Sequence, residues 1–392
     1  FRQGQLFYHA GPRLTMGTMS QGSTKEAAGK NGRDFRILLD DAITGHRLTE
    51  GEAVRLFSCN DRQVWQIAAA ADRRREEAVG DVVTYVRNQN INVTNYCINR
   101  CGFCGFSKKP GDEGGYFSDL DQIREKAGMA SERNVTEICS VSGLHPDFNA
   151  ESYLGIIRTL REGAPGVHIH ASNPMEVAYA ARKSGISTIE VLEQMKEAGL
   201  GSLCGTAAEI LVDEVRQVIC PGKISTNDWI RIIREAHRLG IPTTATIMYG
   251  HCETVEDRVR HLSILREIQD ETGGFTEFVP LSFIHMNTPL FKSGIARPGA
   301  TGREDLLMTA VSRLFLDNIS HIQVSWVKTG LKMAQLGLLA GADDLGGTMF
   351  EESISKCAGA ENTDYLDPGD MERMATDIGR TLRQRDTLYR FI

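Results

Sequence analysis

Runs of β-branched and aromatic residues alternate along most of the chain with segments in which apolar residues recur every three or four positions. The short runs predict strands, and the periodic segments predict amphipathic helices between them. The predicted strands span residues 91–95, 136–142, 167–171, 201–206, 243–249, 276–283, 321–327 and 344–348. About eight strand and helix units in succession favour an α/β fold, a TIM-type (β/α)8 barrel, with an open doubly wound sheet as the alternative.

The same pattern divides the chain into four parts. Residues 1–30 contain no apolar core of the kind that a secretory signal requires, and they are predicted to be a disordered tail or leader. A helical extension is predicted over 31–88, with a helix start signal at Thr49. The barrel then occupies 89–350, and residues 351–392 are predicted to form C-terminal helices.

Charge and composition exclude several classes of protein. The chain carries 44 lysines and arginines against 51 acidic residues, a net charge of −7, so a basic nucleic-acid-binding protein is not expected. No apolar run reaches the roughly 18 residues that a membrane span needs. Nine cysteines, an odd number, argue against a disulfide framework and predict a reducing compartment, the cytoplasm.

The most informative segment places Cys97, Cys101 and Cys104 directly after the first predicted barrel strand. Active sites of such barrels form at this end of the strands, and thiolates suit iron–sulfur clusters or zinc. A zinc site would need a fourth ligand, and no second CxxC or HxxxH pair follows at zinc-finger spacing. A redox dithiol of Cys101 and Cys104 would leave Cys97 without a role. The segment therefore favours a 4Fe-4S cluster held by three cysteines, with one iron open to another ligand.

This Cys-x3-Cys-x2-Cys pattern resembles the signature of the radical S-adenosylmethionine (SAM) superfamily. The resemblance implies that SAM binds the open iron and that the aromatic ring before the last cysteine, Phe103, lies against the adenine. It also implies that an electron from the cluster cleaves SAM to methionine and a 5′-deoxyadenosyl radical, which takes a hydrogen atom from the substrate. The cofactors supply this chemistry, while the barrel excludes water and aims the radical.

Further segments narrow the resemblance to the second subunit of FO synthase, over roughly residues 85–360. Aminofutalosine synthase, of menaquinone biosynthesis, shares several of these segments and is the alternative within the superfamily. A non-catalytic zinc or thiol-redox module is the alternative of another class. The matching segments are 136–139, 143–146, 168–171, 199–202, 205–211, 246–251, 273–281, 344–348 and 352–355.

The resemblance to FO synthase implies a reaction between L-tyrosine and 5-amino-6-(D-ribitylamino)uracil. A hydrogen would leave the tyrosine amine, the Cα–Cβ bond would break, and the 4-hydroxybenzyl radical would add to C5 of the uracil, on the way to coenzyme F(420). A ferredoxin or flavodoxin would supply the electron. Only one three-cysteine pattern occurs in the chain, so a separate radical SAM protein, FO synthase subunit 1, would complete the deazaflavin.

The same resemblance assigns further residues to SAM. Ser142 and Gly143 belong to the loop after the second strand, which meets the SAM amino group in the family, although Ser142 replaces a usual glycine. Glu209 is expected to accept hydrogen bonds from the ribose hydroxyls, with an ordinary helix-start acid as the alternative. Arg216 is expected to pair with the SAM carboxylate, with a surface arginine as the alternative.

Polar residues on other strands complete the predicted site. Tyr249, His251 and Glu253 lie at the C-terminal end of a strand, the functional rim of a barrel, and are predicted to be catalytic. The predicted substrate-binding residues are His168, His170, Glu277 and His285, followed by Trp326 and Lys328. The other cysteines are expected to be free thiols, because their spacing gives no support for a second cluster: Cys59, Cys139, Cys204, Cys220, Cys252 and Cys357.

Overall fold

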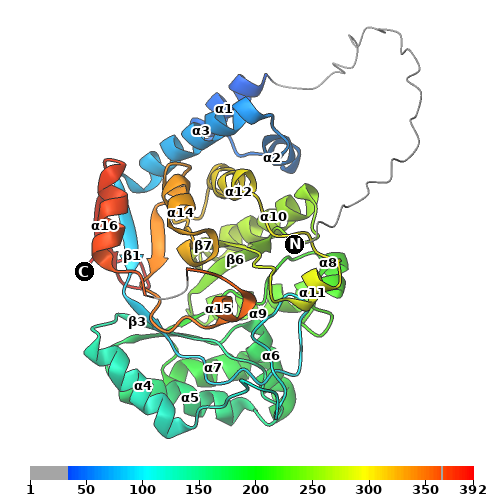
Figure 1. Cartoon of the computed structure of the whole chain (residues 1–392), viewed down its shortest axis with the longest axis vertical. Coiled ribbons are helices and arrows are strands. Elements are labelled where there is room, and N and C mark those ends of the chain that lie inside the picture. The colour runs from blue at the N-terminus through cyan, green and yellow to red at the C-terminus, as the bar shows by residue number, and fades with distance from the viewer. Residues whose placement is uncertain (1–33, 363–364) are drawn as a thin grey trace, which may run out of the picture.

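The computed structural model describes residues 34–362 and 365–392, so the tail or leader predicted over 1–30 lies outside the described residues. Parallel strands surrounded by helices form its centre (Figure 1). Six strands make one sheet in the order β2-β3-β4-β5-β6-β7, and a second sheet has the order β8-β1-β9. The strand bounds are β1 Val82–Val86, β2 Asn88–Asn90, β3 Glu137–Ser140, β4 His168–Ala171, β5 Ser202–Leu203, β6 Thr243–Tyr249, β7 Phe275–Ser282, β8 Asp344–Gly347 and β9 Thr381–Arg385.

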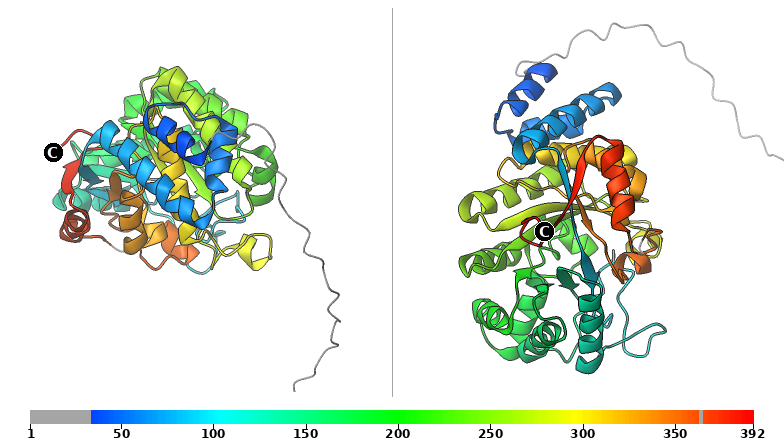
Figure 2. Two further views of the ribbon diagram at one scale, coloured as in Figure 1. Left: turned by 90° about the horizontal axis from the view of Figure 1, so that it is seen from above. Right: turned by 90° about the vertical axis from the view of Figure 1, so that its left-hand side faces the viewer.

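Helices cover the outside of the strands, as both views in Figure 2 show. In α9 the periodic residues Trp229, Ile233 and Ala236 are buried against the barrel, as their spacing predicts. No described helix combines the length and the apolar character that crossing a bilayer requires. The helix bounds are α1 Phe35–Ile43, α2 Glu50–Phe57, α3 Asp61–Val79, α4 Leu120–Glu132, α5 Ala150–Gly163, α6 Pro174–Ser184, α7 Thr188–Ala198, α8 Asp213–Ile219, α9 Thr226–Arg238, α10 Val255–Thr272, α11 Pro289–Lys292, α12 Gly302–Phe315, α13 Trp326–Thr329, α14 Leu331–Leu338, α15 Ile354–Ala358 and α16 Pro368–Asp377.

Short bridges join the two sheets into a closed barrel. Phe278 of β7 bridges Ile322, and the next residue, Gln323, bridges Asp344 of β8. Because β8 pairs with β1, and β1 leads almost directly into β2, the circle of strands is complete. The strand predicted over 321–327 is reduced to this link, since α13 begins within it. The (β/α)8 prediction is therefore confirmed.

The N-terminal extension differs from the prediction at its end. The helices α1, α2 and α3 lie where the helical pattern predicts them, and α3 packs against α12. The remainder of the segment 31–88 contains the strand β1 instead of more helix. Four of the five residues of β1 are buried, and a strand buried on both faces shows no alternation of apolar and polar residues. The prediction was wrong here although the sequence marks the change, since Gly80 caps α3 with a φ of 72° and a run of valine, threonine and tyrosine follows it.

The C-terminal segment 351–392, predicted to be helical, also contains a strand. After α15 and α16, β9 pairs in parallel with β1, from Thr381 opposite Val82 to Arg385 opposite Val86. Three of the five residues of β9 are arginine or glutamine, so its sequence lacks the β-branched run that marked other strands. Since β1 precedes β2, β9 lies at the N-terminal end of the barrel, away from the loop that carries the three cysteines.

Arg385 closes this end of the barrel within a group of buried charges. Its guanidinium donates to both carboxylate oxygens of Asp344 and to Glu277 Oε2, the latter at 3.3 Å. The ring of Tyr389 stacks on His321 with centroids 3.5 Å apart, and its hydroxyl donates to Glu277 at 2.6 Å. Burial raises the pKa of Glu277 to about 7, against the opposing effect of Arg385. Glu277, predicted to bind substrate, is therefore engaged far from the cysteine loop.

Candidate active site

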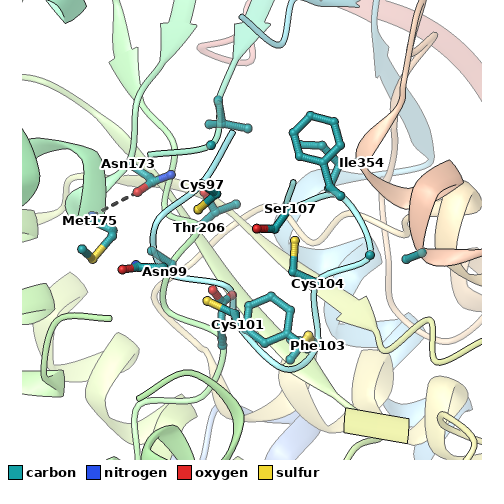
Figure 3. A pocket seen from close by; sticks show the side chains of 18 of the residues that line it. Cys97, Asn99, Cys101, Phe103, Cys104, Ser107, Asn173, Met175, Thr206 and Ile354 are labelled. Atoms are coloured by element: carbon teal, nitrogen blue, oxygen red, sulfur yellow. Dashed lines mark hydrogen bonds between the residues drawn. The ribbon is translucent and has the colours of Figure 1, made fainter. Parts of the chain in front are cut away.

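A cavity of about 240 Å³ lies at the C-terminal ends of the barrel strands, and the cysteine loop forms one of its walls (Figure 3). The other walls come from segments that follow β3, β4 and β5 and from the ends of β6 and β7. Segments that are far apart in the sequence thus meet where barrel active sites form. The lining includes Cys97, Cys101, Phe103, Cys104, Ser142, Gly143, Glu176, Glu209, Lys223 and Lys328.

The backbone of the cysteine loop is fixed from two sides. The N–H of Gly102 donates to the Ile219 carbonyl at 2.9 Å, and the Gly102 carbonyl accepts from the N–H of Leu290 at 2.8 Å. A side chain at Gly105 would meet the carbonyl oxygen of Cys357 at 2.6 Å, so only glycine fits there. The three thiols leave this one loop and line the same cavity (Figure 3). The loop can therefore present three sulfur ligands together.

The donor set fits an iron–sulfur cluster. Burial raises the pKa of the Cys101 thiol and of the Cys104 thiol, while the neighbouring Lys223 ammonium lowers both. A bound cluster would replace the protons of these thiols, because metal ligands bind in the deprotonated form. No fourth cysteine or histidine from the described parts of the chain lines the cavity. The arrangement leaves room for one ligand that the protein does not supply.

An ion pair between Glu209 and Lys223 stands beside the cysteines. Lys223 donates to Glu209 Oε1, and its ammonium lies 5.3 Å from the centre of the Phe103 ring. Although burial opposes the charge, the Glu209 carboxylate holds the pKa of Lys223 above its usual value. Glu209 has a positive φ of 42°, a strained conformation for a residue other than glycine. The predictions for Phe103 and Glu209 thus agree with the lining of the cavity.

Arg216 stabilises the segment around Glu209 by hydrogen bonds to its backbone. Its side chain is buried and donates to the carbonyl oxygens of Ala208, of Ile210 at 3.3 Å and of Ile224 at 2.7 Å. The carbonyls of Ala208 and Ile210 lie on both sides of Glu209, so the guanidinium fixes the loop that carries it. Arg216 is buried, so the alternative of a surface arginine is wrong, and its side chain does not line the cavity where the sequence placed its contact with SAM.

Ser142 and Gly143, which the sequence assigned to SAM binding, line the cavity, and the structure shows why glycine is needed at the second position. A side chain at Gly143 would lie 2.4 Å from the carbonyl oxygen of Tyr96, which precedes the first cysteine. The hydroxyl of Ser142 accepts a hydrogen bond from the N–H of Val93 at 2.8 Å. Its own N–H donates to Glu176 Oε1 at 3.3 Å. The segment therefore connects the cysteine loop to α6.

Glu176, which the sequence did not reveal, is a buried acid in the cavity wall. It lies in the first turn of α6, where Asn173 caps the helix, so its position in the sequence is that of an ordinary helix-start acid. Its Oε2 atom is buried without a hydrogen-bond partner among the described residues. Burial raises the pKa of Glu176 to about 8, although the N–H groups of Ser142 and Asn173 lower it. Glu176 is therefore open to a hydrogen-bonding ligand.

Replacement of Glu176 by glutamine is expected to make the ligand-free protein less sensitive to pH. Because the pKa of this acid is about 8 in the folded chain and near 4.5 when exposed, its ionisation destabilises the fold as the pH rises between these values. The free energy of unfolding of Glu176→Gln relative to the wild type should rise by about 2–5 kcal/mol from pH 5 to pH 8. Denaturant midpoints measure this difference. Equal pH profiles for both proteins would contradict the burial of an ionisable group here.

Lys328, a weaker candidate on sequence, also lies in the cavity wall. Its ammonium donates to the hydroxyl of Ser355 at 2.6 Å, and burial lowers its pKa despite the nearby Glu352. The neighbouring Trp326 donates to a backbone carbonyl of β8 and does not line the cavity. The cavity therefore combines two half-buried lysines with two buried glutamates, an arrangement suited to a zwitterionic ligand.

The three residues predicted to be catalytic at the end of β6 do not line the cavity. The hydroxyl of Tyr249 donates to Asp305 at 2.7 Å. The carboxylate of Glu253 accepts from the main chain of the turn at 2.6 and 2.8 Å and from Arg258 at 2.6 Å. His251 bonds a carbonyl oxygen of β6 at 3.1 Å. Their polar groups therefore bond the turn itself and the neighbouring helices α10 and α12.

The histidines that were predicted to bind substrate lie outside the lining of the cavity. His168 and His170 share one face of β4, and both hydrogen-bond the hydroxyl of Ser202, at 2.8 and 2.7 Å. Burial lowers the pKa of both, that of His170 to about 4, so both rings are neutral near pH 7. His285 packs edge-on against Phe291 with ring centroids 4.4 Å apart. None of the three lines the cavity.

Solved structures resemble the whole fold. Methylornithine synthase (PylB) superposes with a TM-score of 0.70 at 19% identity, covering 88% of this chain and 97% of its own. The [FeFe]-hydrogenase maturase HydG superposes with a TM-score of 0.71 at 15% identity, covering 89% of this chain and 75% of its own. At these identities the likeness concerns the fold alone, and it supports the barrel described above.

Sequence comparisons identify the family. Residues 91–265 match the model of the radical SAM superfamily, and residues 272–392 match the CofH/MqnC C-terminal region. A 5-amino-6-(D-ribitylamino)uracil–L-tyrosine 4-hydroxyphenyl transferase of Methanosphaerula palustris is 70% identical over 91% of this chain and 98% of its own length. The protein of that name from Methanothermobacter thermautotrophicus is 48% identical over 88% of this chain and 94% of its own. The chain therefore belongs to the 5-amino-6-(D-ribitylamino)uracil–L-tyrosine 4-hydroxyphenyl transferase family of radical SAM enzymes.

Proposed function

We propose that this chain joins the 4-hydroxybenzyl group of L-tyrosine to C5 of 5-amino-6-(D-ribitylamino)uracil in the biosynthesis of the deazaflavin FO. The observation that carries the proposal is a loop of three thiols at the cavity of a barrel that is 70% identical to a transferase of this name. The polar lining of the cavity suits two substrates that both carry amino groups and hydrogen-bonding oxygens.

Cys97, Cys101 and Cys104 would hold a 4Fe-4S cluster, and the open iron would take SAM. Support comes from the shared cavity and the fixed backbone of their loop. When bound, the cluster and SAM supply an electron and a radical that removes hydrogen from tyrosine. The protein keeps water away from this chemistry, because Cys101 is only 6% exposed and the neighbouring Phe106 only 5%.

The remaining cavity residues would bind SAM around the cysteine loop. The Glu209 carboxylate would accept hydrogen bonds from the ribose hydroxyls, and the Phe103 ring would face the adenine. The unpartnered oxygen of Glu176 is placed to accept from the SAM amino group, and the Lys223 ammonium to pair with its carboxylate. Ser142 would orient Glu176 through its backbone N–H, while its hydroxyl oxygen accepts from the N–H of Val93.

The proposal includes partners and a location. A ferredoxin or flavodoxin would deliver the electron, and a separate radical SAM protein would close the deazaflavin ring. No disulfide joins cysteines in the described part of the chain, which suits the reducing cytoplasm that we propose. The net charge of −7 gives no support for a nucleic-acid partner.

Anaerobic reconstitution tests the proposed function. The iron-loaded protein is incubated with a reductant, SAM, tyrosine and the ribitylaminouracil, and the products are separated by mass spectrometry. We expect 5′-deoxyadenosine together with a 4-hydroxybenzyl adduct of the uracil. An adduct formed only with a 3-[(1-carboxyvinyl)oxy]benzoate acceptor would instead indicate an aminofutalosine synthase of menaquinone biosynthesis. Zinc in place of iron, with no SAM cleavage, would favour a metal or thiol-redox module.

Replacement of Glu209 by glutamine should raise the KM for SAM by about 10- to 100-fold, because hydrogen bonds to a charged group contribute about 1.5–3 kcal/mol. Steady-state formation of 5′-deoxyadenosine measures this effect. Glu214→Gln, at an exposed position in the first turn of α8, is the matched control and should leave KM unchanged. A KM for Glu209→Gln equal to that of the control would remove Glu209 from the SAM site.

A further inference from the structure

Three soft ligand groups meet inside the barrel, outside the lining of the cavity. Sulfur atoms of Cys139 and Cys204 and a ring nitrogen of His170 all lie within 4.8 Å of one another. His170 and Cys204 are buried, at 7% and 2% exposure, and Cys139 is half-buried. The role that the sequence assigned to His170 was substrate binding, and both cysteines were expected to be unrelated free thiols. The fold instead brings the three residues together.

The strand register explains why these side chains meet. Cys139 of β3 pairs directly with His170 of β4, so the two side chains stand opposite each other on one face. His170 in turn pairs with Ser202 of β5. Cys204 follows Ser202 by two residues and therefore points to the same face. Its N–H still bonds the carbonyl of Ser172 after β4 at 2.9 Å, which keeps this register beyond the end of the strand.

The imidazole of His170 is already oriented by a neighbour. Its Nδ1 atom lies 2.7 Å from the hydroxyl of Ser202, which is itself held by His168 at 2.8 Å. Hydrogen bonds of this kind fix the tautomer and the direction of a metal-binding histidine. The chain thus provides both three ligand atoms and a support for the histidine ring.

A direct disulfide between the two cysteines does not suit this geometry. Cys139 lies on β3 and Cys204 at the end of β5, with β4 between them. Two strand spacings separate their backbones by about 9–10 Å, whereas a disulfide needs Cα atoms within about 7 Å. A cation between the side chains can span this gap, because each metal–ligand bond adds about 2.0–2.3 Å.

We propose that Cys139, His170 and Cys204 form a binding site for a divalent cation of borderline softness, with zinc as the expected ion. Two thiolates and one neutral imidazole are ligands that zinc prefers, and two thiolates balance its charge within a buried site. Three protein ligands leave one coordination position open. Val141 and Thr206, each two residues further along the chain than Cys139 and Cys204, line the main cavity, so the proposed site is close to it.

Cobalt binding tests the site without reliance on catalysis. The full chain with Cys97, Cys101 and Cys104 replaced by alanine is titrated anaerobically with Co²⁺, and the visible spectrum is recorded. We expect about one equivalent to bind, with thiolate-to-cobalt charge transfer and the intense d–d bands of tetrahedral cobalt. His170→Ala and Cys204→Ala, each added to this variant, should weaken binding at least about tenfold. Cys252→Ala, which removes a thiol outside the group, should leave the spectrum unchanged.

The proposal would be overturned if the folded variant without the three cluster cysteines does not bind cobalt tightly. It would also be overturned if His170→Ala and Cys204→Ala leave cobalt binding unchanged. Circular dichroism checks that each variant is folded. A second measurement uses the reconstituted wild-type protein, in which zinc and iron are determined together. Loss of about one zinc per chain in Cys204→Ala, with iron unchanged, supports the site; no zinc in either protein overturns it. Iron content and SAM cleavage report separately on the proposed transferase, so failure of one inference is distinguishable from failure of the other.

Discussion

Replacement of Cys101 by alanine is expected to remove the cluster iron and to abolish SAM cleavage, with the barrel still folded. Loss of a residue that merely supports a metal ligand costs about 10- to 100-fold in metal affinity or activity, so loss of one of three ligands should cost more. The fold should survive because the cysteine loop lies at the ends of the strands, while the core is formed by the strands and outer helices. Iron content, 5′-deoxyadenosine formation and circular dichroism measure the three effects.

Cys220→Ala is the matched control for this experiment. Cys220 is a buried thiol close enough to influence the pKa of Cys101, yet it does not line the cavity. The control should keep its iron and its activity. A Cys101→Ala protein with full iron content and wild-type SAM cleavage would show that the ligand set has been assigned to the wrong residues.

Replacement of Arg385 by alanine is expected to lower the free energy of unfolding by about 3–5 kcal/mol. Removing one partner of a buried ion pair leaves the other charge buried without compensation. Arg385 is 2% exposed and donates to Asp344 and Glu277, which are also buried. Its loss would also loosen β9, whose last residue it is, from the end of the barrel. Chemical denaturation of the ligand-free protein measures the change.

Arg383→Ala provides the control on the same strand. Arg383 is exposed, and its guanidinium lies 4.3 Å from the centre of the Phe391 ring. An exposed contact of this kind contributes about 0.5–1 kcal/mol, so the control should be only slightly less stable than the wild type. Equal stability of the two variants would show that β9 and its buried arginine do not close the barrel as described.

The strands that the sequence predicts well are those with their own apolar run. The prediction for β6, residues 243–249, has the bounds of the structure, because that strand consists of threonine and apolar residues throughout. The run over 201–206 is poorly marked, and β5 within it has two residues. β1 and β9 were missed for opposite reasons. β1 has a β-branched run like that of β6, but it follows the long helix α3 directly and was included in the predicted helical extension, whereas β9 is polar and is held in place by the contacts of Arg385 with distant residues.

In the candidate site, too, the residues that the sequence revealed are those with a local sequence signal. The cysteines, Phe103, Gly143 and Glu209 were found because each lies in a short segment that resembles a family. Glu176 and Lys223 were not found, since each stands alone in its segment and only the barrel brings it to the cavity. Tyr249 and Arg216 show the converse. Their residue types suggested chemistry, but the direction of each side chain and its internal partners depend on tertiary packing.

In the proposed reaction, the Cα–Cβ bond of tyrosine is cleaved and the 4-hydroxybenzyl group is joined to the uracil. Tyrosine labelled with ¹³C at the benzylic carbon tests this most directly, with the adduct weighed and fragmented by mass spectrometry. We expect an adduct heavier by the one labelled carbon, with the label on the carbon attached to C5. An unlabelled adduct, or 5′-deoxyadenosine formed without any adduct, would contradict it.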